Sequence, residues 1–177
     1  MHVLFVCTGN VCRSPTAERL ARSYAAGSGF SALQASSAGT RAVIGHPIHS
    51  ESSRVLGNLG GDSSGFTARQ LTPQIASSAD LIITMARAHF DRVLMLAPQK
   101  LHKTFTLVEA AQLATDYGAE CVADLPGLRP HLKVDGLLDI PDPIGQRPEV
   151  FDSVGMQIRN LLPPLLDLCR RSWVRSV

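Results

Sequence analysis

Short apolar runs alternate along the chain with longer stretches of helical periodicity. The apolar runs have the length of strands and cover Val3–Val6, Leu33–Ser37, Ala79–Met85 and Lys103–Leu107. Helices are predicted between and after them, over Thr16–Ala26, Ser50–Leu59, Arg87–Leu96, Val108–Ala114 and Glu149–Trp173. Strands that are separated by helices pair in parallel, with right-handed crossovers. The pattern therefore predicts an α/β fold of three layers, α/β/α, with helices on both sides of a parallel sheet.

Two segments depart from this alternation. Residues 116–146 are rich in Pro, Gly and Asp, and we expect them to be mostly loop. Pro163 and Pro164 fall inside the last helical pattern, and we expect them to kink or divide that helix. A chain of 177 residues is long enough for one buried core and too short for two ordinary domains, so we expect a single domain over residues 1–177.

Composition narrows the classes of partner. The net charge of +2 and the aromatic content of 5% are too low to predict nucleic-acid binding. We expect no membrane association, because no segment has the length of a membrane span and Val3–Val6 lacks the features of a signal peptide. A cytoplasmic location is the default, with the four cysteines reduced. Only His46 and His49 lie close together among the six histidines, so no metal site is predicted.

The most informative segment joins the first strand to the first helix and reads Cys7-Thr8-Gly9-Asn10-Val11-Cys12-Arg13-Ser14. Gly9 and Asn10 tolerate the left-handed backbone angles that turn N–H groups inward, and such a nest at a helix N-terminus binds a tetrahedral anion. Arg13 adds a guanidinium that holds two phosphate oxygens at once. The predicted phosphate-binding residues are therefore Thr8, Gly9, Asn10, Val11, Cys12, Arg13 and Ser14.

Cys7 lies at the base of this loop and is the predicted nucleophile. The loop amides, the helix dipole and Arg13 all favour its thiolate, which would attack a bound phosphoryl group in line. Ser14 is expected to cap the helix and to donate to Cys7, which stabilises the sulfur as a leaving group, and Asn10 is expected to brace the loop. A lone cysteine would be read as a buried core thiol. That interpretation does not explain the spacing of Cys, Arg, Ser and Pro at one strand-to-helix junction.

Cys12 has two interpretations that the sequence leaves open. It could capture an oxidised Cys7 as a disulfide and so protect it, or it could be a small apolar filler under the loop.

A phosphoester also needs a proton for its leaving group, and a tyrosyl leaving group has a pKa near 10. Asp142 is the predicted acid, because prolines on both sides hold it in a stiff loop. Asp139 is the competitor, and the residues alone do not separate the two. An Asp-Pro pair is otherwise typical of an ordinary turn.

These residues resemble the low-molecular-weight protein tyrosine phosphatases. Cys7 to Pro15 reproduces that family's Cys-x5-Arg-Ser-Pro phosphate loop. Four further segments of the chain resemble landmarks of the family: Ser37–Thr40, Ala68–Thr72, Ala79–Met85 and Asp142-Pro143. The resemblance implies a four-stranded parallel sheet, no cofactor, and the roles of nucleophile for Cys7, transition-state clamp for Arg13 and acid, then base, for Asp142. It also implies a phosphorylated protein as substrate, with hydrolysis of phosphotyrosine through a cysteinyl-phosphate. Phosphate and other oxyanions are the expected inhibitors, and a monomer is expected, with a weak dimer as the alternative.

Three other functions would use similar residues. A protein arginine phosphatase of the same fold is the nearest, and Thr8 is compatible with it. An arsenate reductase would need a close pair of extra cysteines, whereas Cys121 and Cys169 lie far apart in the sequence. A module that only binds phosphate would have no need of the complete catalytic set.

One departure from the family's pattern concerns the substrate. Tyrosine-specific members often carry aromatic residues at the positions of Val43-Ile44 and Ile144-Gly145. The walls of the cleft would therefore hold an aromatic ring less well in this chain.

Overall fold

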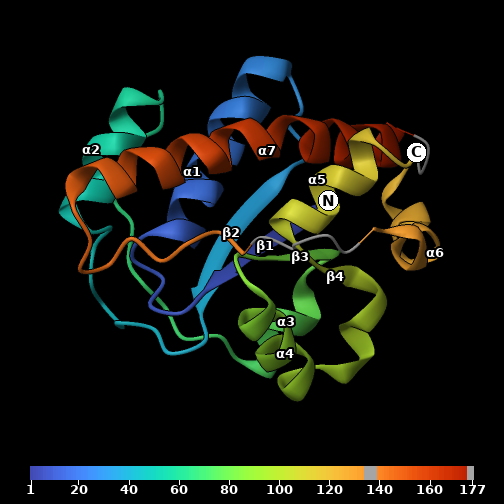
Figure 1. The fold of residues 1–177 in the computed structure, drawn as a ribbon, viewed down its shortest axis with the longest axis horizontal. Helices are drawn as coiled ribbons and strands as arrows, with labels where there is room; N and C mark the ends of the chain where they lie inside the picture. The colour runs from blue at the N-terminus through green and yellow to red at the C-terminus, as the bar shows by residue number, and fades with distance from the viewer. Residues whose placement is uncertain (134–138, 175–177) are drawn as a thin grey trace.

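Four strands form one parallel sheet in the computed structural model, which describes residues 1–133 and 139–174 (Figure 1). The strands are β1 (His2–Cys7), β2 (Gln34–Gly39), β3 (Leu81–Thr84) and β4 (Thr104–Thr106), in the order β2-β1-β3-β4. All three pairings are parallel, and Val3 of β1 lies opposite Ala35 on one side and Leu81 on the other. The predicted four-stranded parallel sheet is confirmed, and β1 lies inside it.

Helices cover both faces of the sheet. They are α1 (Arg13–Ser28), α2 (Ser50–Asn58), α3 (Pro73–Ser78), α4 (Arg87–Leu96), α5 (Leu107–Thr115), α6 (Leu125–Leu128) and α7 (Pro148–Val174), with short 3-10 turns at Pro98–Lys103, Val122–Asp124 and Arg129–His131. In Figure 1, α1, α5 and α7 lie on one side of the sheet, and α3 and α4 lie on the other. No helix in the described part of the chain combines the length and the apolar character needed to cross a bilayer.

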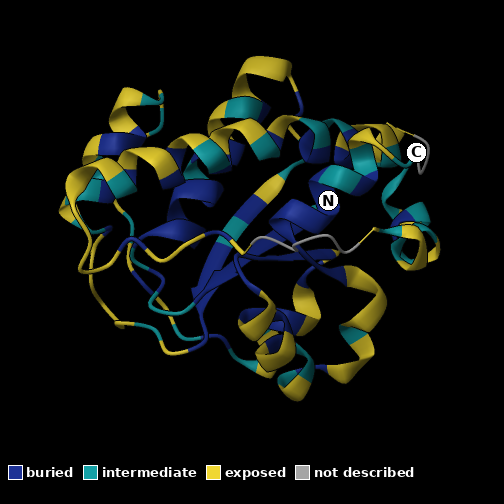
Figure 2. Ribbon diagram, in the orientation of Figure 1, coloured by how far each residue is buried: buried dark blue, intermediate teal, exposed yellow. Residues whose placement is uncertain are grey.

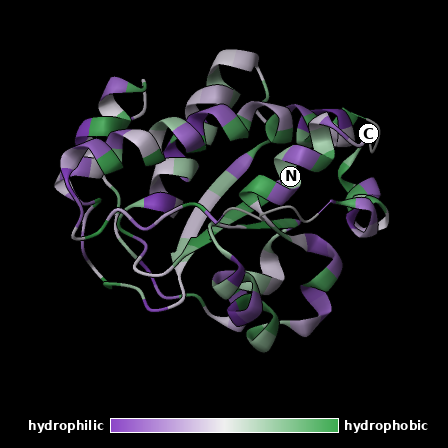
Figure 3. Cartoon of the chain, viewed as in Figure 1, coloured by the Kyte–Doolittle hydropathy of each residue, from purple (hydrophilic) through white to green (hydrophobic). Residues whose placement is uncertain are grey.

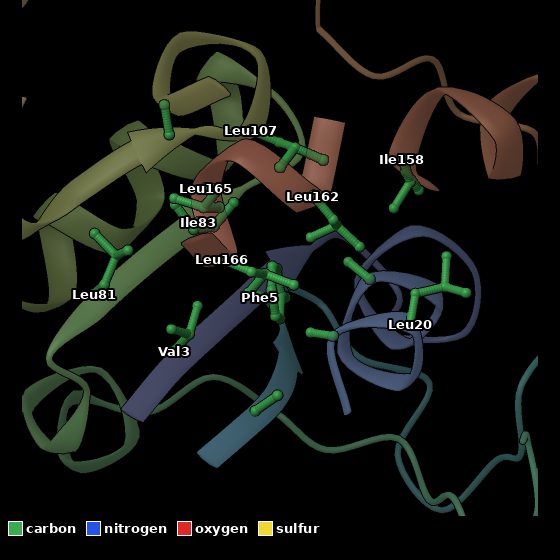
Figure 4. Close-up of a cluster of buried hydrophobic side chains, with 14 of the residues drawn as sticks. Val3, Phe5, Leu20, Leu81, Ile83, Leu107, Ile158, Leu162, Leu165 and Leu166 are labelled. Carbon is green, nitrogen blue, oxygen red and sulfur yellow. The ribbon is translucent and has the colours of Figure 1, made fainter. Parts of the chain in front are cut away.

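The sheet is buried because successive side chains of β1 point into two different cores. Val3 and Phe5 pack with residues of α1, α5 and α7, as Figure 4 shows, whereas Leu4 and Val6 pack on the side of α3 and α4. Strands that are covered on both faces are apolar throughout, which explains the continuous run in the sequence. Figure 2 shows the strands mostly buried, and Figure 3 shows polar residues concentrated on the outer faces of the helices.

The segment predicted to be mostly loop contains more structure than expected. The 3-10 turn Val122–Asp124, α6 and the turn Arg129–His131 follow one another within it, and residues 134–138 lie outside the described part of the chain. Leu125 is fully buried in the main core, and Arg129 donates to Glu109 of α5 at 2.6 Å. Long-range contacts therefore stabilise turns that are too short to produce a periodic pattern. The short helix α3 was not predicted for the same reason.

Helix α7 is continuous over 27 residues, so Pro163 and Pro164 do not divide it. Proline leaves the carbonyls four residues earlier, at Arg159 and Asn160, without helical donors. Both of these residues are exposed, so water can hydrate their carbonyls. On the opposite side, Leu162, Leu165 and Leu166 are buried in the main core. Burial of this apolar face offsets the loss of two helical hydrogen bonds.

The close approach of α2 and α7 gives a test of the packing. A Cβ atom at Gly155 would lie 2.3 Å from Cγ1 of Val55, whereas one at Gly57 in α2 would meet nothing within 4 Å. We expect Gly155→Ala to lower the free energy of unfolding by about 1–3 kcal/mol through overpacking. Gly57→Ala, the control, should raise it by about 0.5–1 kcal/mol because alanine favours the helix. Urea denaturation measures both, and equal stability of the two variants would contradict the packing described.

Candidate active site

The loop between β1 and α1 lies at the carboxyl end of a central strand, where parallel α/β sheets bind their ligands. The segment that follows β2 donates hydrogen bonds to the carbonyl oxygens of this loop. The N–H groups of Thr40 and Arg41 donate to Cys7 and Thr8, respectively. Those of Val43 and His49 donate to Gly9 and Val11, and all four distances are 2.8–3.0 Å. In contrast, the N–H groups of residues 8–14 donate to no group within the described residues. The loop therefore turns its carbonyls outward to the protein and leaves its amides without protein acceptors in the described part of the chain.

Asn10 is the residue that makes this turn possible. Its φ of 56° lies in the left-handed region and is the only positive φ of a non-glycine residue in the described chain. Asparagine tolerates this conformation better than most residues. The prediction that Gly9 also adopts it is wrong, because Gly9 is not among the glycines with positive φ. One left-handed residue is enough to curl the loop.

The side chain of Asn10 orients the hydroxyl of Ser14 toward the sulfur of Cys7. Nδ2 of Asn10 donates to Oγ of Ser14 at 2.9 Å, and this oxygen lies 3.0 Å from Sγ of Cys7. Because the serine oxygen accepts from Asn10, its own proton is free to point at the sulfur. The expected cap is not formed: α1 begins at Arg13, and the serine hydroxyl inside its first turn contacts Cys7 and Asn10 instead.

A second branch of the network leads away from the loop. Nδ2 of Asn10 also donates to Oγ of Ser37 at 2.8 Å, and Ser37 donates to the buried carboxylate of Glu18 at 2.6 Å. Oδ1 of Asn10 accepts from the backbone N–H of Arg69 at 2.9 Å, which fixes the orientation of the amide. Every polar atom of the Asn10 side chain is therefore engaged. No role was predicted for Glu18, and Ser37 and Arg69 were marked only as parts of segments that resemble family landmarks, because groups from three separate elements meet only in the fold.

Arg13 lies almost fully buried beside the loop, with a side chain that is 6% exposed. Its Nη1 donates to the carbonyl of Ile140 at 3.0 Å, and its Nη2 donates to the carboxylate of Asp142. Its Nε is buried and has no hydrogen-bond partner within the described residues. A buried donor without a partner is costly, and here it belongs to the side chain that the sequence predicted to hold phosphate.

The two candidate acids have different surroundings. Asp142 contacts Arg13 and is 48% exposed, so its carboxylate reaches both the loop and solvent. Asp139 accepts from the N–H of Arg87 at 2.8 Å and so serves the N-terminus of α4. Between them, the N–H of Ile140 donates to the carbonyl of Met85 at 2.8 Å, which ties the segment to the end of β3. The fold brings Asp142, and not Asp139, into contact with Arg13.

Cys12 is buried and packs with Val55 and Phe151. Burial raises the pKa of its thiol to about 11, against the opposing effect of a hydrogen bond with Ser52. Cys12 and Cys7 are both free thiols. The packing matches the filler interpretation, and capture of an oxidised Cys7 stays a prediction.

His89 of α4 is a further polar residue at the site. Its Nε2 lies 2.8 Å from Oγ1 of Thr8, so the Thr8 side chain is held by α4. Burial, together with the positive charge of Arg13, lowers the pKa of His89 to about 4, and the ring is neutral at pH 7. No feature of the sequence marks it, because a lone histidine in an amphipathic helix is common. A neutral ring adds no competing positive charge beside the loop.

The rim of the loop is partly aliphatic. Val43 and Ile44 are 44% and 67% exposed, and the Cβ position of Gly9 is 3.5 Å from Cγ2 of Val43. Ile144, two residues after Asp142, is 48% exposed. Within the described residues, no group of three or more His, Cys, Asp or Glu side chains is arranged to hold a metal ion. The arrangement therefore consists of an anion-binding loop, a sulfur beneath it, a guanidinium and a carboxylate, with apolar side chains at its edge.

Comparisons with known proteins agree on one family. The sequence model described as "Low molecular weight phosphotyrosine protein phosphatase" matches residues 2–124. Etp of Escherichia coli K12, a low molecular weight protein-tyrosine-phosphatase, is 37% identical over 102 residues, which cover 58% of this chain and 66% of Etp, just under two thirds of its length. Wzb of the same strain, also a low molecular weight protein-tyrosine-phosphatase, is 28% identical over 99% of this chain and 95% of Wzb.

Solved structures give the same fold. The low molecular weight protein tyrosine phosphatase of T. tengcongensis superposes with a TM-score of 0.75 at 31% identity, covering 94% of this chain and 98% of that one. The YwlE arginine phosphatase of Geobacillus stearothermophilus superposes with a TM-score of 0.72 at 27% identity, covering 94% and 90% of the two chains. Similar scores for both proteins mean that the fold does not distinguish their substrates.

The neutral His89 predicts how stability depends on pH. Its pKa is about 4 in the folded chain against 6.5 for an ordinary histidine, so the folded state excludes a proton that the unfolded state binds. The stability that depends on neutral His89 is fully present above pH 6.5. As the pH falls to about 5, the free energy of unfolding decreases by about 2 kcal/mol. We expect His89→Asn to flatten the dependence of the free energy of unfolding on pH in this range. His102→Asn, at an exposed position, should keep the slope of the parent, and a parental slope in His89→Asn would contradict the assignment.

Proposed function

Because the chain belongs to the low molecular weight phosphotyrosine protein phosphatase family, we propose that it hydrolyses phosphotyrosine in proteins through a cysteinyl-phosphate on Cys7. In the first step, the Cys7 thiolate attacks phosphorus, the bond to the tyrosyl oxygen breaks, and Asp142 gives that oxygen a proton. In the second step, Asp142 takes a proton from water, the water oxygen attacks phosphorus, and the thiolate leaves. Inorganic phosphate is released and no cofactor takes part.

The observation that carries this proposal is the loop around Cys7. The unused amides of residues 8–14 and the unpaired Nε of Arg13 supply donors for the phosphoryl oxygens. Donors that are already in place stabilise the charge of the transition state without reorganisation. The hydroxyl of Ser14, aimed at Sγ of Cys7 from 3.0 Å, stabilises the thiolate both as nucleophile and as leaving group.

The choice of Asp142 as acid rests on its position. It contacts the guanidinium that is proposed to hold the phosphoryl group, so its carboxyl lies near the leaving-group oxygen of a bound substrate. Asp139 is already engaged by the N–H of Arg87, which makes it a positioning residue of α4. The anchoring of Ile140 to Met85 and to Arg13 keeps the short segment between the two aspartates in place.

The substrate is the open part of the proposal. Exposed Val43, Ile44 and Ile144 offer apolar surface for an aryl group, although none of them is aromatic. The fold shared with an arginine phosphatase keeps phosphoarginine as the alternative. An arsenate reductase is less well supported, because Cys169 is fully buried and its burial raises its pKa to about 12, which is unsuited to a thiol relay.

We extend the proposal to the surroundings of the enzyme. A cytoplasmic location suits a mechanism that needs a reduced thiol at Cys7. A phosphorylated protein is the proposed partner, phosphate and other oxyanions are the proposed inhibitors, and a monomer is proposed as the working form. We also propose that residues 1–177 fold as one domain, since the site draws on both ends of the chain.

The experiment that tests the function compares kcat/KM for phosphotyrosine, phosphoserine and phosphoarginine in one peptide sequence. We expect the parent chain to prefer phosphotyrosine and Cys7→Ser to lose at least about 1,000-fold in turnover, because serine is a far weaker nucleophile at neutral pH. Cys121→Ser, at a partly exposed position away from the loop, is the control and should retain parental turnover. A preference for phosphoarginine would replace the substrate and keep the mechanism, whereas activity in Cys7→Ser would refute the mechanism.

The role of Asp142 predicts a dependence on the leaving group. Asp142→Asn should lower kcat/KM for phenyl phosphate by roughly 100-fold to 10,000-fold, and for p-nitrophenyl phosphate by much less, because the activated phenolate needs no proton. Asp139→Asn is the matched control and should affect both substrates equally. Losses of the same size for both substrates in Asp142→Asn would show that another group supplies the proton.

A further inference from the structure

A cavity of about 300 Å³ lies on the other side of the polar network that supports Cys7. Three arginines line it, Arg19 and Arg22 of α1 and Arg69 between α2 and α3, together with Glu18, Ser37 and Thr67. Three positive charges against the single carboxylate of Glu18 give these side chains a net charge of +2. The cavity is outside the loop that holds the proposed phosphoryl group, and the proposed reaction does not use it.

The one carboxylate of the cavity is already engaged. The side chain of Glu18 is 5% exposed, and its Oε1 lies 2.8 Å from Nη2 of Arg22. Its Oε2 accepts from Ser37 at 2.6 Å. Glu18 therefore lies closest to Arg22, with Nε of Arg19 at 3.6 Å, and one carboxylate shared by three guanidinium groups leaves the cavity positively charged.

Two of the arginines have donors to spare. Nε of Arg19 is buried and forms no hydrogen bond within the described residues, and it lies 3.6 Å from Glu18, beyond hydrogen-bond distance. Nε of Arg69 donates to the carbonyl of Ser37 at 2.8 Å, and its guanidinium has no carboxylate within 4.0 Å in the described part of the chain. Guanidinium groups match the oxygens of a tetrahedral anion in both charge and geometry.

Ser37 connects this cavity to the nucleophile. Its hydroxyl accepts from Asn10 and donates to Glu18, and its carbonyl accepts from Arg69. Asn10 in turn donates to Ser14, whose hydroxyl lies against the sulfur of Cys7. A displacement of Glu18 therefore reaches Cys7 through the hydrogen-bonded side chains of Ser37, Asn10 and Ser14, and a displacement of Arg69 acts on the same serine through its backbone carbonyl.

We propose that this cavity binds inorganic phosphate, the product of the proposed reaction, and that its occupation lowers turnover at Cys7. A phosphate dianion held by Arg19 and Arg69 draws the Arg69 guanidinium away from the carbonyl of Ser37. Ser37 then holds Asn10 less firmly, and Asn10 no longer keeps the hydroxyl of Ser14 on the sulfur. The kinetic half of this proposal rests on the proposed function, and the binding half does not.

The departure of the thiolate from the cysteinyl-phosphate is the step that slows most, because the Ser14 hydroxyl stabilises the negative charge on the sulfur of Cys7. Phosphate in the catalytic loop competes with substrate and raises the apparent KM alone. Phosphate in the second cavity remains bound when substrate is saturating, so it lowers kcat. A plot of kcat against phosphate concentration therefore distinguishes the two sites, because only phosphate in the second cavity lowers kcat.

Initial rates with p-nitrophenyl phosphate measure this effect, with sodium chloride keeping the ionic strength constant. We expect kcat of the parent to fall roughly 3-fold to 10-fold as phosphate saturates the cavity, the effect of weakening one hydrogen bond to a charged group. Arg19→Gln should abolish this decrease, relative to its own kcat without phosphate. Arg159→Gln, an exposed arginine of α7, carries the same change of charge and should behave as the parent.

Binding is followed independently of catalysis by amide NMR during a phosphate titration. We expect Gly65 and Thr67 to shift with a midpoint different from that of the loop amides, and to stop shifting in Arg19→Gln while the loop amides still respond. Purely competitive inhibition of the parent would overturn the proposed link to Cys7, and the absence of shifts at Gly65 and Thr67 would overturn the site. If the chain hydrolyses no phosphoester at all, the proposed function fails while the titration still decides whether phosphate binds here.

Discussion

The side-chain amide of Asn10 is the interaction on which the rest of the site depends. It accepts from the backbone of Arg69 and donates to both Ser14 and Ser37, so one planar group joins the loop to α1, to β2 and to the segment between α2 and α3. Its backbone is also the left-handed point at which the loop turns. An apolar side chain here would leave the backbone N–H of Arg69 without its partner and would remove the donor that Ser14 and Ser37 share, and an unsatisfied polar group costs about 1–3 kcal/mol when it is buried. The hydrogen bonds that support Cys7 and the shape of the loop thus depend on the same residue.

The parts of the molecule that could be predicted from sequence are those set by local pattern. The apolar runs of β1 and β3 report strands that are buried on both faces, and the Cys7–Ser14 segment is contiguous, so its order along the chain already implies its arrangement. The sequence predicted separate roles for Arg13 and Asp142 but not the contact between their side chains. The resemblance to a known family, and not the residues alone, favoured Asp142 over Asp139.

What the sequence could not predict depends on contacts between distant elements. Glu18 and Ser37 look like ordinary helix and strand residues, and their connection to Asn10 exists only after α1 packs on the sheet. The same applies to the neutral state of His89, which follows from burial against Thr8 and not from any motif. The error at Pro163 and Pro164 has the opposite origin: a strong local rule gives way to the burial of Leu162, Leu165 and Leu166.

The hydrogen bond from Arg13 to Ile140 spans 127 positions of the sequence. At the usual rate of protein synthesis, about 5–20 residues per second, the ribosome makes Arg13 roughly 6–25 s before the residue that will cover it. The nascent chain therefore carries Arg13 without this carbonyl partner until the segment around Ile140 has been made. The surroundings of Cys7 that favour its thiolate can form completely only at a late stage of synthesis.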